Sequence, residues 1–114
     1  MERMDASDEQ RARNELLFRE INERVEEINE RLDGDSDDLL MVFVCECGNT
    51  ECNEHIKLRR AEYEAVRANP KHFAVLPGHE DLRIAHVVEQ HDGFFVAEKV
   101  GEAAEMAVEQ DPRT

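Results

Sequence analysis

The sequence predicts an α+β fold: a long N-terminal amphipathic helix, an acidic linker, and a small, mostly antiparallel sheet with one or two short helices. Three features predict it. Apolar residues have helical spacing at the start, a short acidic segment follows, and brief strand-forming runs then alternate with turn residues. The 114 residues suffice for one domain with an appendage. We therefore expect a helix over residues 1–33, a linker over 34–38 and a metal-binding α+β domain over 39–114.

The N-terminal helix is predicted from Ser7 to about Leu32. Ser7 and Gln10 have the spacing of a capping box, and Gly34 stands where a glycine commonly ends a helix. Apolar residues recur at alternating spacings of three and four, as in two heptads of a coiled coil: Phe18, Ile21, Val25, Ile28 and Leu32. This apolar stripe suits a helix packed on its own domain, or a helix 7–32 paired with another chain. Two heptads do not decide between them.

The linker over residues 34–38 is acidic and has no apolar residue, which is typical of a solvated connection. Counted from Asp33, the sixth position is Asp38 and the twelfth is Val44, where the calcium-binding loop of an EF-hand needs Gly and Glu. An EF-hand is therefore excluded.

The domain after the linker combines short strands with short helices. The apolar run over residues 39–44 predicts a buried strand, and a helix is expected over residues 61–69, where a proline stops it. Residues 83–90 fit a strand or a helix, but the Asp92-Gly93 turn before the apolar run 94–97 favours a β-hairpin. The other predicted segments are strands at 56–58 and 73–76 and a helix at 102–109.

Composition and charge exclude several classes of protein. The formal net charge of −14 disfavours nucleic-acid binding, because that affinity depends on Lys and Arg at the phosphates. The chain has no apolar run long enough for a membrane helix, and Met1 to Asp5 do not begin a signal peptide. Three cysteines, an odd number, favour a reducing compartment over a disulfide framework, so a cytoplasmic location is expected.

Three cysteines within eight residues mark the chemistry of the chain. Cys45, Cys47 and Cys52 form a C-x-C-x4-C pattern. Residues i and i+2 of an extended strand point to the same face, so the first two thiols are expected side by side. Gly48 and Asn49 can adopt the tight return that brings Cys52 back to them. The pattern predicts a zinc-knuckle-like loop, which one histidine completes to a Cys₃His site for Zn²⁺.

Two histidines are candidates for the fourth ligand. His55 closely follows Cys52 in the sequence, but it begins a predicted strand and can simply face solvent. His79 follows the Pro77-Gly78 turn, which places an imidazole at a rigid loop tip. From this chemistry we favour His79 and keep His55 as the alternative.

Several motifs of the chain resemble those of a group of short, uncharacterised bacterial proteins. The likeness extends from Asn14 to Arg113. It is carried by an N-E-x-x-F-R-E-x-N-E-R helix, the C-x-C-x4-C loop, Y-E-A-V-R at 63–67, P-G-H at 77–79 and E-K-V-G at 98–101. In that group the P-G-H element accompanies the cysteine loop, whereas a histidine at the position of His55 does not, which implies His79 as the ligand. The group has a Ser or Thr helix cap where this chain has Arg59-Arg60, and the resemblance implies no activity.

The motifs of known zinc enzymes are mostly missing. The H-E-x-x-H pattern fails because position 83 is Arg, and the histidine here follows the cysteines, whereas in zinc deaminases it precedes them. An open three-cysteine site with Glu46 or Glu51 as base is the remaining enzymatic alternative. We therefore expect a non-enzymatic protein with a structural zinc site, acting as a regulatory or adaptor partner through its helix, with another protein or as a homodimer. A thiol or zinc redox sensor is the alternative.

Overall fold

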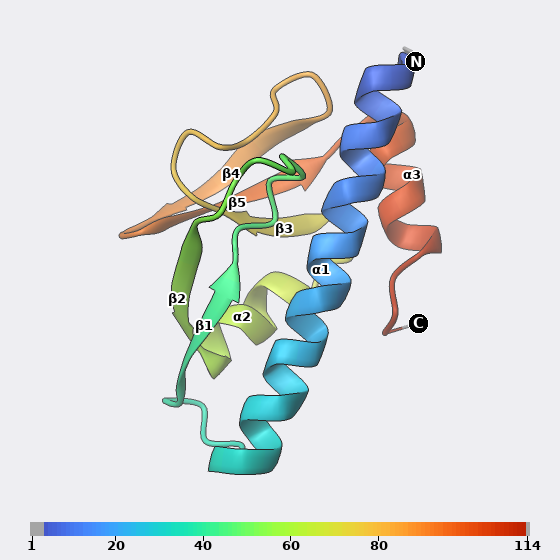
Figure 1. Ribbon diagram of the computed structural model, residues 1–114. Helices are drawn as coiled ribbons and strands as arrows, with labels where there is room; N and C mark the ends of the chain where they lie inside the picture. Colours follow the sequence, from blue (N-terminus) through green and yellow to red (C-terminus); the bar gives the residue numbers. More distant parts are fainter. Residues whose placement is uncertain (1–3, 114) are drawn as a thin grey trace.

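One long helix runs along a body of two small sheets and two short helices in the computed structural model, which describes residues 4–113 (Figure 1). The elements are α1 Ala6–Asp33, β1 Leu40–Val44, β2 His55–Arg59, α2 Arg60–Arg67, β3 His72–Val75, β4 Ala85–His91, β5 Phe94–Lys99 and α3 Gly101–Glu109. Residues 1–3 and 114, at the ends of the predicted segments 1–33 and 39–114, lie outside the described residues. The predicted α+β fold class is confirmed. Within residues 4–113, no helix combines the length and apolar character needed to cross a membrane.

Both sheets are antiparallel. β1 pairs with β2 from Leu40 opposite Arg59 to Val44 opposite His55, so the cysteine loop connects two paired strands. The second sheet has the order β3-β5-β4. Its β4–β5 hairpin turns at Gly93, which has a φ of +91°, as the Asp-Gly signal predicts.

α2 follows β2 directly and begins without a Ser or Thr cap. The side chain of Glu62 accepts a hydrogen bond of 2.8 Å from the backbone N–H of Arg59 instead. This bond pairs one of the donors that a helix start leaves open. The helix therefore begins at Arg60, one residue before the prediction, and ends at Arg67.

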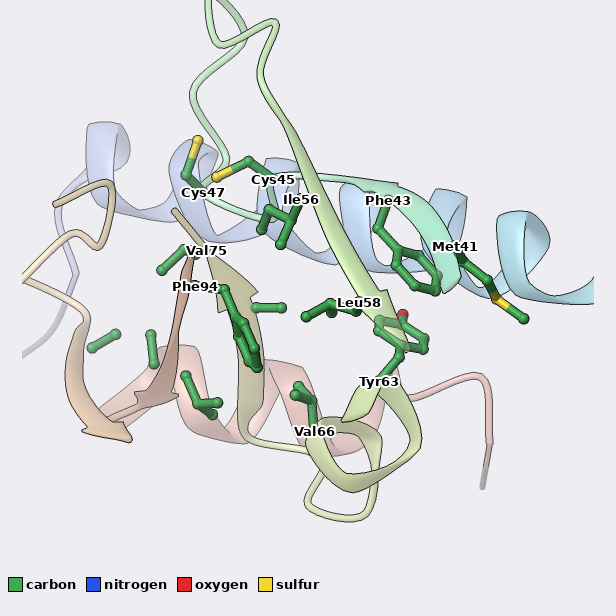
Figure 2. Close-up of a cluster of buried hydrophobic side chains, with 14 residues drawn as sticks. Met41, Phe43, Cys45, Cys47, Ile56, Leu58, Tyr63, Val66, Val75 and Phe94 are labelled. Atoms are coloured by element: carbon green, nitrogen blue, oxygen red, sulfur yellow. The ribbon is translucent and has the colours of Figure 1, made fainter. Parts of the chain in front are cut away.

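The main core lies between the sheets and α2. Phe43 of β1 stacks on Tyr63 of α2, with ring centroids 4.2 Å apart. Figure 2 shows Cys45 and Cys47 on one border of this cluster and Met41 at another. The remaining buried members are Ile56, Leu58, Val66, Ala74, Val75, Ala85, Phe94, Val96 and Ala97. Because two of the thiols belong to a packed interior, the core restricts the directions in which they point.

α1 packs on the body through a face that differs from its apolar stripe. The buried residues are Ala12, Glu15, Arg19, Asn22 and Glu26. Arg19, Asn22 and Glu26 each come one position after a residue of the apolar stripe. Because one residue corresponds to a rotation of about 100° around the helix axis, the centre of the stripe lies about 100° away from the face that contacts the body. Phe18 and Val25 remain half-buried, whereas Leu17, Ile21, Ile28 and Leu32 are exposed. The helix therefore contacts its own domain mainly through polar side chains.

The start of α1 also differs from the prediction. Asp5, not Ser7, is the N-cap, and its carboxylate accepts a 2.8 Å hydrogen bond from the Asp8 N–H. The predicted Ser7–Gln10 capping box is wrong, because Asp caps a helix as well as Ser and stands two residues earlier. At the other end Gly34 donates its N–H to the Glu30 carbonyl, as expected of a helix-ending glycine.

The acidic linker is exposed but bonded to the body. The Asp37 carboxylate accepts a 3.0 Å hydrogen bond from the Arg60 side chain. The backbone carbonyl of Asp37 accepts a second hydrogen bond, of 3.1 Å, from the Ala61 N–H. The segment between α1 and β1 thus also supplies partners for the first turn of α2.

Candidate metal centre

Cys45, Cys47, Cys52 and His79 place their ligand atoms within 4.8 Å of one another. His79 Nδ1 lies 3.7 Å from Cys45 Sγ and 3.6 Å from Cys52 Sγ. In a tetrahedral zinc site, with zinc–sulfur bonds of about 2.3 Å and zinc–nitrogen bonds of about 2.0 Å, a sulfur and a nitrogen ligand stand about 3.5 Å apart. The two sulfur–nitrogen distances in this Cys₃His cluster therefore fit a tetrahedral metal site.

The side chain between the first two cysteines fixes their direction. Glu46 is fully buried, and its carboxylate is directed into the core. Its carboxylate accepts hydrogen bonds from the Ala74 N–H at 2.9 Å, the Asn22 amide at 2.8 Å and the Tyr63 hydroxyl at 3.3 Å. Burial raises the pKa of Glu46. These bonds to three other elements hold the cysteine segment in place.

Asn22 of α1 fixes the strand end that leads into the cysteine loop. Its side-chain oxygen accepts from the Val44 N–H at 2.9 Å, and its amide donates to the Val44 carbonyl at 2.8 Å. Both backbone groups of Val44 face α1 rather than another strand, so Asn22 takes the place of a strand partner on this edge.

Backbone N–H groups surround the sulfur atoms. The Leu76 N–H donates to Cys45 Sγ at 3.3 Å, and the backbone N–H groups of Asn49 and Glu54 donate to Cys47 and Cys52. Hydrogen bonds of this kind favour the thiolate over the thiol. They also orient the sulfurs, which is the role of groups behind metal ligands in general.

The three thiols interact electrostatically as one group. A hydrogen bond from Cys45 lowers the pKa of Cys47 to about 4 and raises that of Cys45. Burial raises the pKa of Cys52. These interactions favour the thiolate at Cys47, and a cation bound to all three sulfurs would favour the thiolate form of each.

Arg11 of α1 connects the two segments that carry the ligands. Its Nε donates to the Cys47 carbonyl at 2.6 Å, and its terminal nitrogen donates to the His79 carbonyl at 3.2 Å. Asn14, one turn further along, donates to the Gly48 carbonyl at 3.0 Å. α1 therefore sets the separation between the cysteine loop and the turn that carries His79.

Gly48 allows the cysteine loop to lie directly on α1. Its φ is +74°, and a Cβ at this position would stand 2.5 Å from Glu15 Cγ and 2.7 Å from the Arg11 carbonyl oxygen. Only glycine combines this φ with so close an approach. Beneath it Glu15 forms a buried ion pair of 2.5 Å with Lys99. Burial raises the pKa of Glu15 to about 7 and lowers that of Lys99.

The other candidate residues lie elsewhere. His55 is the first residue of β2, is exposed, and is not in the cluster of residues 45, 47, 52 and 79. Glu46 is bonded in the core, and Glu51 is exposed. Sequence reasoning missed the supporting roles of Arg11 and Asn22. The signal for them is the polar, helically spaced set that includes Glu15 and Arg19, which lies beside the apolar stripe in the sequence.

The fold and the site define a small α+β protein with a Cys₃His cluster that can hold a metal ion. No protein-family model, no curated protein and no solved structure matches this chain.

Proposed function

We propose that this protein is a non-enzymatic zinc protein whose Cys₃His centre is structural and that it acts as a regulatory or adaptor partner through α1. The observation that carries the proposal is the convergence of four protein donors within 4.8 Å of one another, with sulfur–nitrogen distances of 3.6 and 3.7 Å that fit a tetrahedral zinc site. Three thiolates and one imidazole in a tetrahedron are a ligand set typical of structural zinc.

A zinc ion in this cluster would join parts of the chain that are far apart in sequence. Cys45 and Cys52 precede His79 by 34 and 27 residues. The cysteine loop follows β1 and His79 follows β3, and these strands belong to different sheets. Since the unfolded chain has no preformed site, the free energy of zinc binding adds to that of folding. This supports a structural role.

The geometry also supports a non-enzymatic role. Catalytic zinc keeps one position open for water or substrate, whereas four protein donors fill a tetrahedron. The carboxyl group of Glu46, a candidate base in an open site, is directed into the core and bonded to Asn22. It is therefore not positioned to accept a proton from a zinc-bound water.

α1 is the proposed contact surface because its apolar stripe faces solvent. Arg11, Asn22 and their neighbours on the opposite side hold the helix on the body and on the cysteine loop. A fixed helix with exposed leucine and isoleucine side chains suits recognition of another protein surface.

Removal and return of zinc tests the structural role. Chelation should lower the thermal midpoint by about 10 °C or more, because a ligand held at a large excess over its dissociation constant contributes a few kcal/mol to folding. Added Zn²⁺ should restore the midpoint, while Mg²⁺, the control, should not. A protein whose unfolding is the same with and without its zinc would contradict the proposal.

A zinc-linked redox sensor is a second candidate, which the position of Cys52 favours. Cys45 and Cys52 both line a groove of about 250 Å³, and Cys52 is half-buried, whereas Cys45 and Cys47 are buried. Hydrogen peroxide that reaches Cys52 would transfer one oxygen atom to the thiolate, which becomes a sulfenate, and the peroxide would be reduced to water. Attack by a second cysteine thiolate, with uptake of protons, would then form a disulfide, expel water and release zinc. Zinc release at low peroxide, followed with a chromogenic chelator, would favour the sensor, and retention until unfolding would favour the structural role.

A further inference from the structure

The geometry points to a second copy of this chain as the partner of the apolar surface that α1 and β1 form together. This inference rests on the proposed role of α1 as a contact surface and names its partner. We call this surface the α1–β1 face and define it by six exposed apolar residues: Leu17, Ile21, Ile28, Leu32, Leu40 and Val42.

The helical and strand parts of the α1–β1 face meet at a groove. Asn22 bonds both backbone groups of Val44, which holds α1 against the edge of β1. Phe18 and Ile21 of the helix line the groove together with Val44 of the strand. Val42 continues the outer side of β1, because alternate residues of a strand share a face. The stripe and the strand therefore form one surface.

The α1–β1 face is large enough for an interface between two proteins. Its six apolar side chains are between 39% and 76% exposed, which amounts to on the order of 500 Å² of apolar surface. The largest apolar patch of a typical monomer covers roughly 300–600 Å². With the polar side chains beside it, the face approaches the roughly 800 Å² that each partner contributes to a standard interface.

The order of residues on the exposed side of α1 is self-complementary. An antiparallel pair of α1 helices, related by a two-fold axis between Arg24 and Val25, brings the four exposed apolar residues of the helix opposite one another. The apolar pairs are Leu17 with Leu32 and Ile21 with Ile28. A two-fold dimer uses the same patch on both subunits, so a patch that matches its own reverse meets this requirement.

Charged residues beside the stripe match in the same way. Glu20, Arg24, Glu27 and Arg31 are all exposed and alternate in sign along α1. The same two-fold operation leaves Glu20 two positions from the level of Arg31 of the second copy, and Arg24 two positions from the level of Glu27. This offset is about 3 Å along the helix axis, which these long side chains can span. Opposite charges across an interface select one partner and one register. A basic partner would instead be favoured by a uniformly acidic flank, which this part of α1 does not have.

The mass of the zinc-loaded full chain tests the inference. Light scattering after gel filtration, over roughly 5 to 300 μM protein, should show a shift from the 13.2 kDa monomer to twice that mass as concentration rises. Because two chains of net charge −14 repel each other, added salt should strengthen the dimer. Zinc measured in every fraction separates this test from that of the metal centre, since dimerisation without zinc would contradict only the proposed zinc function.

Matched variants locate the interface. Ile28→Glu should raise the dissociation constant of the dimer tenfold or more without loss of zinc. Leu82→Glu is the control, because it adds the same charge at an exposed leucine outside the face, and it should change the dissociation constant less than twofold. The double variants Arg24→Glu with Arg31→Glu and Glu20→Arg with Glu27→Arg should each be monomeric, and their mixture should form a one-to-one dimer. A wild-type chain that stays monomeric up to the highest concentration at low and high salt overturns the inference. A dimer unaffected by Ile28→Glu, or double variants that do not associate when mixed, also overturns it.

Discussion

The contact between the cysteine loop and α1 depends on a position that has no room for a side chain, so Gly48→Ala should destabilise the protein strongly. The new methyl group would stand 2.5 Å from Glu15 Cγ and 2.7 Å from the Arg11 carbonyl oxygen. The side chain of Glu15 is itself held by Lys99, and the Arg11 carbonyl belongs to the helix backbone. Neither can move without disturbing buried bonds, so the loop must shift away from α1.

The magnitude follows from two contributions. A residue other than glycine at a φ of +74° costs about 1 kcal/mol, and overpacking against a fixed neighbour adds roughly 1–3 kcal/mol. Gly93→Ala is the matched control, because Gly93 has a φ of +91° but nothing within 4 Å of the added Cβ. It should therefore show only the first cost. In a domain of this size 1 kcal/mol corresponds to about 4 °C, so Gly48→Ala should lower the thermal midpoint by about 8–16 °C and Gly93→Ala by about 4 °C.

Thermal unfolding of both variants in saturating zinc measures the difference. The zinc content should be determined in parallel, since a shifted loop should also weaken the retention of the ion. Equal midpoints for the two variants would refute the reasoning, because they would mean that the loop does not rest on α1 at this point.

Two further predictions concern the polar contacts of α1. Asn22→Ala should cost roughly 3 kcal/mol in urea unfolding, because it leaves both backbone groups of Val44 without a partner and removes one of the hydrogen bonds to the Glu46 carboxylate. Asn29→Ala, at the equivalent position one heptad later, should cost less than about 1 kcal/mol, since it loses only a bond within the helix. Equal costs would contradict the role of Asn22. Burial and the neighbouring Glu64 carboxyl raise the pKa of Glu26 from 4.5 to about 8. The folded state therefore binds this proton more tightly, and its contribution to stability, complete below pH 4.5, is lost as the pH rises through 8. Urea unfolding of Glu26→Gln and of the wild type from pH 5 to 9 tests this. The free energy of unfolding of the variant, relative to that of the wild type, should increase with pH over this range. A difference that does not change with pH would exclude this titration.

The sequence was most informative where structure depends on near neighbours. The β4–β5 hairpin follows from Asp92-Gly93 between two strand-forming runs, and the strand before Cys45 follows from a continuous apolar segment. The cysteine loop is also local, because residues i and i+2 and a following glycine determine how the thiols converge. The candidate ligand His79 could be selected because a Pro-Gly turn is rigid, although its place beside the thiols needs the second sheet.

The packing face of α1 could not be predicted in this way. The apolar stripe indicated which residues would be buried if burial followed hydrophobicity, but the body is contacted by Glu15, Arg19 and Asn22 instead. Such residues are buried only where partners are ready for them, and those partners are distant in sequence. Arg19 donates to the carbonyls of Pro70 and Ala107. A pattern within one helix holds no information about such partners.

The central claim is that Cys45, Cys47, Cys52 and His79 together hold one structural zinc ion. The most direct test is native mass spectrometry of the wild type and of the variants His79→Ala and His55→Ala. About one zinc per folded wild-type chain is expected, as for other Cys₃His sites. His55→Ala should keep the ion, because this histidine is exposed and stands outside the cluster. His79→Ala should bind zinc more weakly and unfold at a lower temperature. A folded wild-type chain that carries no zinc, or loss of zinc on substitution of His55 but not of His79, would contradict the account.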